Sequence, residues 1–193
     1  MLQEKKLCFS IESDKPNSAY LLSNEIINML KDYADINQLV ILCIGTDRST
    51  GDCLGPLVGD KLTKNFNLKG VNIYGTLENP VHAKNLDDYI DLIYKRHFDP
   101  YILAIDASLG KVENIGKINL YEGPIFPGAG VNKKLSPIGN LSITGIVNMS
   151  GFMEYLILQN TRLSLVMKMA DVISYSLYLS IKRLSINSSF TLR

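Results

Sequence analysis

The chain has 193 residues, and its 20 Lys and Arg against 19 Asp and Glu leave a net charge of +1. This length is typical of one domain with its own core, and the balanced charge excludes the strong positive field that gathers nucleic acid. No apolar run reaches the roughly 18 residues of a membrane span. The first residues lack the apolar stretch of a secretory signal, and three cysteines without a CxxC pair are typical of a reduced, cytoplasmic protein.

The first half of the chain predicts two helices and two strands after a polar start. Residues 1–17 are polar and are expected to form an irregular extension. Apolar residues at helical spacing predict a helix over 18–33, and the wholly apolar segment 39–44 predicts a strand that is buried on both faces. After a glycine-rich loop, Pro56 suits the first turn of a helix that ends near Phe66, and a second strand is expected over 71–74.

The second half continues the alternation and completes the predicted sheet. Its expected elements are a helix over 83–96, strands over 101–105, 117–121 and 141–147, and helices over 152–159 and 163–184. Strands that alternate with helices are typical of a parallel sheet with helices on both faces. The sequence therefore predicts a single α/β domain over 1–193, a three-layer α/β/α sandwich with a mostly parallel sheet.

Two aspartates are the strongest candidates for chemistry. Ligands of such sheets bind beyond the carboxyl ends of the strands, which directs attention to the loops over 45–55, 75–82 and 106–110. The first loop contains Asp52, and Asp106 directly follows an apolar strand. If the two preceding strands are neighbours, both carboxyl groups converge on one crevice. Two carboxyl groups that share a proton can act as acid and base on a water molecule.

Structural roles for both aspartates remain open at this point. Asp52 can cap the helix that follows it, and Asp106 can accept a hydrogen bond from the turn after it. Nucleotide binding is not indicated, because the glycine-rich loop has Asp52 where a P-loop has lysine. Ser108 lacks the first glycine of a nucleophile elbow.

Five further residues are predicted to bind substrate. The loop over 75–82 offers Glu78, Asn79 and His82 as pocket residues, although a histidine near a helix start is more often structural. Gly128 and Gly130 permit close approach of an extended peptide backbone, and loop punctuation is the simpler explanation for them.

Four segments together resemble a known family. They are 45–58, GTDRSTGDCLGPLV; 74–82, YGTLENPVH; 127–131, PGAGV; and 143–155, ITGIVNMSGFMEY. They resemble the YyaC-type sporulation proteins over about residues 39–170. That family is similar to the spore germination protease, which cleaves small DNA-protecting spore proteins. In fold it is similar to the hydrogenase maturation endopeptidases and, more broadly, to phosphorylase/hydrolase-like sandwiches.

The resemblance assigns roles residue by residue. Asp52, followed by Cys-Leu-Gly-Pro, and the pair Asp106-Ala107 match the two aspartates to which catalysis is assigned in the germination protease. Phe126 stands where that protease has a histidine. The hydrogenase endopeptidases bind nickel through two acids and a later histidine, but no histidine follows His97 in this chain. No metal or other cofactor is therefore expected.

The resemblance and the residues together lead to a functional hypothesis. A peptide bond is hydrolysed by water held between Asp52 and Asp106, as in an aspartic-type endopeptidase. The expected partner is a peptide or protein substrate, a spore protein by resemblance, in the cytoplasm of a forespore or mother cell. The alternatives are a non-catalytic protein that binds a peptide in the same crevice and a metal-dependent hydrolase that uses Asp52, Asp106 and His82.

An oligomer is also expected. The mean hydropathy of +0.08 and the long C-terminal helix suggest that some apolar surface pairs with a second copy of the chain. Neither nucleic acid nor a membrane is an expected partner.

Overall fold

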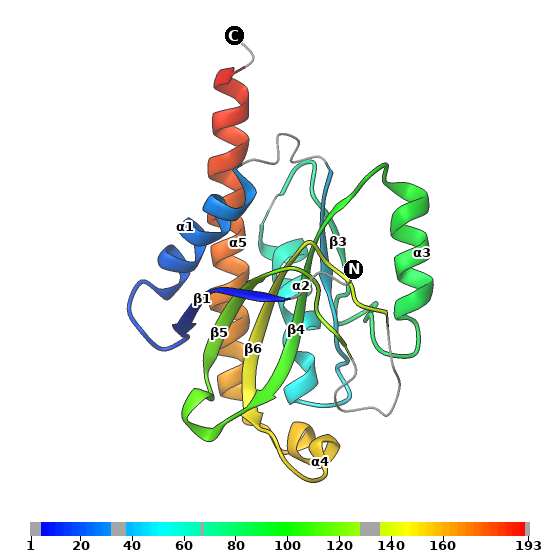
Figure 1. Ribbon diagram of the computed structural model, residues 1–193, viewed down its shortest axis with the longest axis vertical. Helices are drawn as coiled ribbons and strands as arrows, with labels where there is room; N and C mark the ends of the chain where they lie inside the picture. The colour runs from blue at the N-terminus through cyan, green and yellow to red at the C-terminus, as the bar shows by residue number, and fades with distance from the viewer. Residues whose placement is uncertain (1–4, 32–37, 67, 128–135, 192–193) are drawn as a thin grey trace.

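A computed structural model describes residues 5–31, 38–66, 68–127 and 136–191, with side chains as far as residue 186. A six-stranded sheet in the order β1-β5-β6-β4-β2-β3 forms its centre (Figure 1). The strands are β1 (Lys6–Glu12), β2 (Leu39–Cys43), β3 (Asn72–Tyr74), β4 (Tyr101–Gly110), β5 (Lys117–Glu122) and β6 (Leu141–Met149). The helices are α1 (Ser18–Leu30), α2 (Leu54–Asn65), α3 (Leu86–Arg96), α4 (Glu154–Gln159) and α5 (Leu163–Thr191).

The sheet is mostly parallel, as the alternation of elements predicts. β3, β2, β4 and β6 run parallel to one another, and β5 and β1 add an antiparallel edge. All five residues of β2 are buried, which explains why its sequence is apolar throughout. β2 and β4 are direct neighbours in register, with Cys43 opposite Ile105, so the loop after β2 begins beside the middle of β4.

Two apolar cores, one on each face of the sheet, confirm the three-layer architecture. In β4, Leu103 and Ile105 pack in the core beneath α1, α2 and α5, whereas Ile102 and Ala104 pack in the core beneath α3. Figure 1 shows α5 alongside the sheet with α1 and α2, and α3 on the other side. Because side chains alternate along a strand, Asp106 continues the Ile102–Ala104 row on the α3 face.

Two elements differ from the sequence-based expectation, and both affect the site. The polar segment expected to be irregular contains β1, which pairs with β5 as an edge strand and buries only Ile11 fully. Leu7, Phe9 and Ile11 alternate with polar or small residues along β1, a pattern typical of a strand that the expectation of an irregular segment did not take into account. Residues 106–110, expected as a loop, continue β4 and pair with β6 across a bulge after Ser108. Asp106 therefore lies within a strand.

Within the described part of the chain, no helix has both the length and the apolar composition needed to cross a membrane.

Candidate functional site

A pocket of about 490 Å³ opens at the carboxyl end of β2, on the α3 face of β4. Its volume lies in the range of roughly 300–1,000 Å³ that is usual for ligand sites. Asp52, Asp106 and His82 all line it, so the structure brings together three of the residues that the sequence singled out. Lys5, Arg48 and Lys84 also line this pocket and supply positive charge to it.

The loop between β2 and α2 places Asp52 at the pocket. The N–H of Ile44 donates to the carbonyl of Ile105 at 2.7 Å, which ties the start of the loop to β4. The N–H of Thr46 donates to the carbonyl of Asp52 at 3.1 Å and closes the loop. Gly45 has φ +140°, and a Cβ at this position would collide with the Asp52 carbonyl oxygen. Only glycine therefore allows the loop to close and hold Asp52 in place.

Asp106 projects from β4 into the same pocket. Its Oδ1 accepts a hydrogen bond from the N–H of Ala107 at 2.8 Å, which fixes the orientation of the carboxyl group. Burial raises the pKa of Asp106 well above its ordinary value, and the negative charge of Asp52 raises it further. The Ala107 N–H and the positive charge of Lys5 oppose this rise in pKa. The two aspartates are thus close enough for one carboxylate to disfavour ionisation of the other.

The surroundings of Asp52 differ from those of Asp106 because His82 acts on the Asp52 carboxyl group. Burial raises the pKa of Asp52, while the charge of His82 and a hydrogen bond from the Thr46 backbone lower it. His82 is held by its own loop: its N–H donates to Asn85 Oδ1 at 2.8 Å, and its Nδ1 accepts from the N–H of Lys84 at 3.3 Å.

Lys5 is the residue that sequence reasoning missed. It lines the pocket, and its Nζ lies 3.8 Å from the centroid of the Tyr121 ring on β5, within cation–π range. Burial lowers the pKa of Lys5, and the charge of Asp106 counteracts this. Only the pairing of β1 with β5 brings the start of the chain here. The short alternation of Leu7, Phe9 and Ile11 could have indicated a strand, but it does not reveal that β5 is the partner of this strand.

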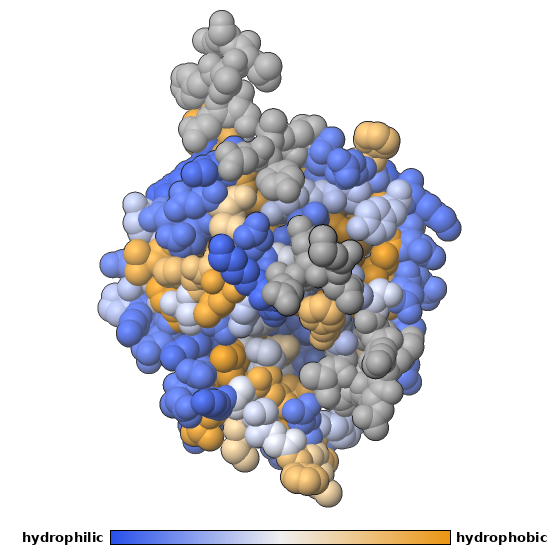
Figure 2. All heavy atoms as spheres, in the orientation of Figure 1, coloured by the Kyte–Doolittle hydropathy of each residue, from blue (hydrophilic) through white to orange (hydrophobic). Residues whose placement is uncertain are grey.

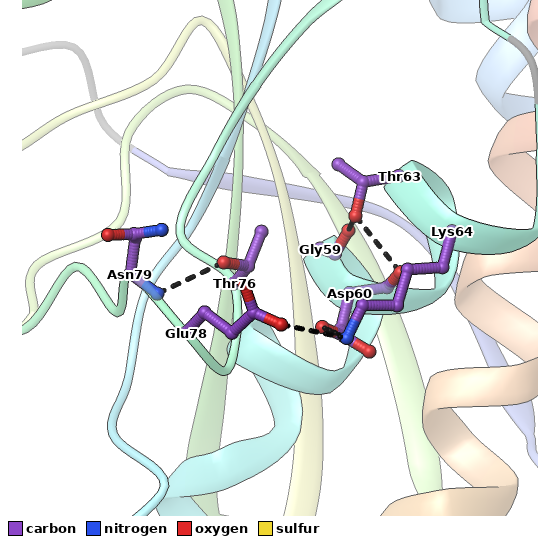
Figure 3. A network of polar contacts seen from close by, with 7 residues as sticks. All are labelled: Gly59, Asp60, Thr63, Lys64, Thr76, Glu78 and Asn79. Carbon is purple, nitrogen blue, oxygen red and sulfur yellow. Dashed lines mark hydrogen bonds and ion pairs between the residues drawn. The ribbon is translucent and has the colours of Figure 1, made fainter.

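Glu78 and Asn79 do not line this pocket, which corrects their expected placement. Figure 3 shows the polar contacts that the two residues make instead. The N–H of Asn79 donates to Thr76 Oγ1 at 3.1 Å in a tight turn. Glu78 is 75% exposed and pairs with Lys64 on α2 at 3.3 Å. Lys64 also pairs with Asp60 at 2.9 Å, so one lysine on α2 contacts both its own helix and the turn that contains Glu78. The loop over 75–82 lies at the expected edge of the sheet, where His82 lines the pocket, but Glu78 in the same loop pairs with α2.

The remaining expected residues, Gly128 and Gly130, lie outside the described residues. Phe126 and Pro127, which precede them, line the pocket, as does Ser49. Ser49 is buried, and its hydroxyl has no hydrogen-bond partner among the described residues.

A metal centre does not fit the described residues. They contain no group of three or more His, Cys, Asp or Glu side chains placed to hold a metal ion. Glu78, the acid that follows the second strand of the parallel sheet, faces α2 and not Asp52. The two acids and one histidine through which the hydrogenase endopeptidases bind nickel therefore have no matching set among the described residues.

Replacing Lys5 with methionine is expected to raise the pKa of Asp106 further. The substitution removes a positive charge that favours the ionised carboxyl group and keeps a side chain of similar length. Carboxyl ¹³C NMR titration of Asp106 measures the effect. Lys6→Met, at an exposed position on β1, is the matched control. An unchanged Asp106 titration in Lys5→Met would show that Lys5 does not act on this group.

Comparisons with known proteins agree with this fold and with the motifs. The family described as "Protein of unknown function (DUF1256)" matches residues 10–176. "Uncharacterized protein YyaC" of Bacillus subtilis (strain 168) is 56% identical over 142 residues, which cover 74% of this chain and 69% of the relative.

Among solved structures, the [NiFe] hydrogenase maturation protease HycI from Thermococcus kodakarensis KOD1 superposes with a TM-score of 0.52 at 16% identity. The match covers 82% of this chain and 99% of HycI, and it shows a shared fold. The family match covers most of the sheet and every pocket segment except the one around Lys5. The chain therefore belongs to the DUF1256 family of YyaC-type proteins.

Proposed function

We propose that this protein is a peptidase that hydrolyses a peptide bond with water held between Asp52 and Asp106. One observation carries the proposal: Asp52, in the loop after β2, and Asp106, within the neighbouring strand β4, line a single pocket, and the charge of Asp52 disfavours ionisation of Asp106. Strongly perturbed carboxyl groups in a cleft are typical of acid–base catalysis. The HycI-like fold supports this assignment. The resemblance of Asp52, followed by Cys-Leu-Gly-Pro, and of Asp106-Ala107 to the two aspartates of the germination protease supports it as well.

The different surroundings of the two aspartates suggest their roles. Asp106 feels both burial and the charge of Asp52, so a proton shared by the pair is placed on Asp106. Asp52, stabilised as a carboxylate by His82, takes a proton from the water whose oxygen attacks the carbonyl carbon. Asp106 gives its proton to the amide nitrogen as the C–N bond breaks. The products are a carboxylic acid and an amine, and the proton taken up by Asp52 passes to Asp106, which restores the starting state.

The biological setting follows from the resemblance alone. The segments shared with YyaC-type sporulation proteins support a spore protein as substrate, in the cytoplasm of a forespore or mother cell.

A cleavage assay on unfolded proteins tests the proposal. The purified chain is incubated with a mixture of unfolded proteins between about pH 4 and 8, with and without a chelator, and new termini are mapped by mass spectrometry. We expect cleavage that the chelator does not affect, with a rate that falls as the pH rises and Asp106 loses its proton. Chelator-sensitive cleavage would instead indicate a metal-dependent hydrolase. Binding without any cleavage would indicate a non-catalytic peptide-binding protein.

A further inference from the structure

The pocket has a second group of lining residues that the proposed chemistry does not use. These residues are apolar and come from two segments that are distant in sequence. They are Ile125, Phe126 and Pro127 after β5, and Tyr155 and Leu158 on α4. Phe126 is 55% exposed and Tyr155 is 58% exposed, so both aromatic rings meet solvent at the pocket. An open pocket that offers two aromatic side chains is suited to cover an apolar group of a ligand.

Helix α4 is anchored directly beside Asp52. It packs against the short turn Gly51–Cys53, which contains that aspartate. A Cβ on Gly51 would lie 2.8 Å from a methyl carbon of Leu158, so the helix and the turn are in close contact. Asn148 at the end of β6 donates to the carbonyl of Ile157 at 3.2 Å and holds α4 from the sheet side. The apolar lining therefore has a fixed position relative to the aspartate pair.

The apolar surface continues out of the pocket along α4. No residue of this helix is buried. Large exposed apolar side chains concentrate between the end of β6 and the start of α5: Met149, Phe152, Met153, Tyr155, Leu156 and Leu163. In Figure 2 orange side chains gather at the lower end of the molecule, where Figure 1 places α4. Tyr155 belongs to both the pocket wall and this α4 surface, so the two are continuous.

We propose that the pocket and the α4 surface bind an extended polypeptide segment, and that a bulky apolar side chain of this segment sits against Phe126 and Tyr155. The inference rests on the proposed peptidase function and names its substrate class, a protein segment with an apolar residue next to the cleaved bond. A polypeptide is favoured over a small molecule because the apolar surface extends beyond the pocket. A ligand confined to 490 Å³ would leave Phe152, Met153 and Leu156 uncovered.

Peptide binding tests the inference separately from catalysis. Fluorescein-labelled decapeptides with a central Phe or a central Ser in the same polar background are titrated against Asp106→Asn protein, in which the chemistry is blocked. The Phe peptide is expected to bind at least about tenfold more tightly, as expected for one large apolar group in a fitted subsite. Tyr155→Ser and Phe126→Ser in the same background should each remove most of this preference.

Two matched controls use aromatic residues outside the pocket. Tyr94→Ser replaces a tyrosine on α3 with almost the same exposure, 57%, and Phe98→Ser replaces a phenylalanine that is 91% exposed. Both controls should keep the preference for the Phe peptide. Equal binding of the two peptides, or equal loss in the control and pocket variants, would overturn the inference.

Cleavage by the parent protein distinguishes this inference from the function on which it rests. Cleavage without preference for apolar residues would refute the apolar subsite and leave the peptidase function standing. A clear binding preference for the Phe peptide, without cleavage of any peptide by the parent, would refute the peptidase function and leave the polypeptide-binding surface.

Discussion

Asp106→Asn is expected to abolish peptide cleavage while it makes the folded protein more stable at neutral pH. Loss of a general acid–base group typically lowers the rate by about 10²–10⁴-fold. The amide keeps nearly the same volume, and its oxygen can still accept the hydrogen bond from the Ala107 N–H. It removes a buried charge that the carboxylate of Asp52 repels. If Asp106 is catalytic and is repelled by Asp52, the Asp106→Asn variant should therefore lose activity and gain stability at the same time.

The stability gain should depend on pH in one direction. Because the pKa of Asp106 is raised in the folded state, the folded protein binds a proton that the unfolded chain releases above about pH 4. The parent therefore loses stability as the pH rises from that value through the folded-state pKa. The asparagine variant does not titrate at this position, so its advantage should be greatest above the folded-state pKa. It should disappear below about pH 4.

Thermal melts of parent and variant across this pH range measure the effect. In a protein of this size each kcal/mol corresponds to about 2–4 °C in Tm. Asp52→Asn should behave in the same direction, because burial also raises the pKa of Asp52. Asp47→Asn, an exposed aspartate in the same loop that does not line the pocket, is the control for removal of a charge. A Tm that falls at neutral pH in both pocket variants would show that the two aspartates are structural.

Gly59→Ala is expected to destabilise the protein strongly, although helix propensity alone predicts the opposite. Gly59 lies inside α2, where alanine is favoured over glycine by about 1 kcal/mol. A Cβ on Gly59 would collide with the carbonyl oxygen of Gly75, just after β3. The added methyl group is fixed to the helix backbone and the Gly75 carbonyl is itself backbone, so the clash is relieved only if the helix moves away from the sheet. Overpacking of this kind typically costs about 1–3 kcal/mol, which outweighs the gain in propensity.

The consequence for the site follows from where α2 begins. Its first residue, Leu54, is two positions after Asp52, so a displaced helix also displaces that carboxyl group. We expect a lower Tm and weaker binding of the Phe-centred peptide in Gly59→Ala. Gly151→Ala, where the nearest atom is 3.9 Å from the added Cβ, should leave both measurements close to those of the parent. A stabilised Gly59→Ala protein would show that α2 has room to accept the methyl group where it lies.

The central part of the fold could be predicted from the sequence, and so could the position of Asp52 and Asp106 at one pocket. β2 is apolar along its whole length because both of its faces are covered, and such a strand can be recognised locally. Helix α3 has a clear amphipathic pattern, with Leu86 and Ile93 buried in the core on its side of the sheet. Strand ends in a parallel sheet meet at one edge, which is why Asp52 and Asp106 could be paired before any coordinates.

The surroundings of Asp52 and Asp106 could not be predicted from the sequence and became clear from the tertiary structure. Lys5 comes near Asp106 through the pairing of β1 with β5, more than 100 residues apart. The alternation of Leu7, Phe9 and Ile11 can indicate a strand, but it does not indicate the strand with which β1 pairs. Glu78 was expected at the pocket, but two ion pairs at Lys64 draw its turn towards α2. Tyr155 lines the same pocket as the aspartates, and the close contact of Leu158 with Gly51 holds α4 beside the turn that contains Asp52. Each of these placements depends on contacts between distant segments, and the local pattern of residues does not encode such contacts.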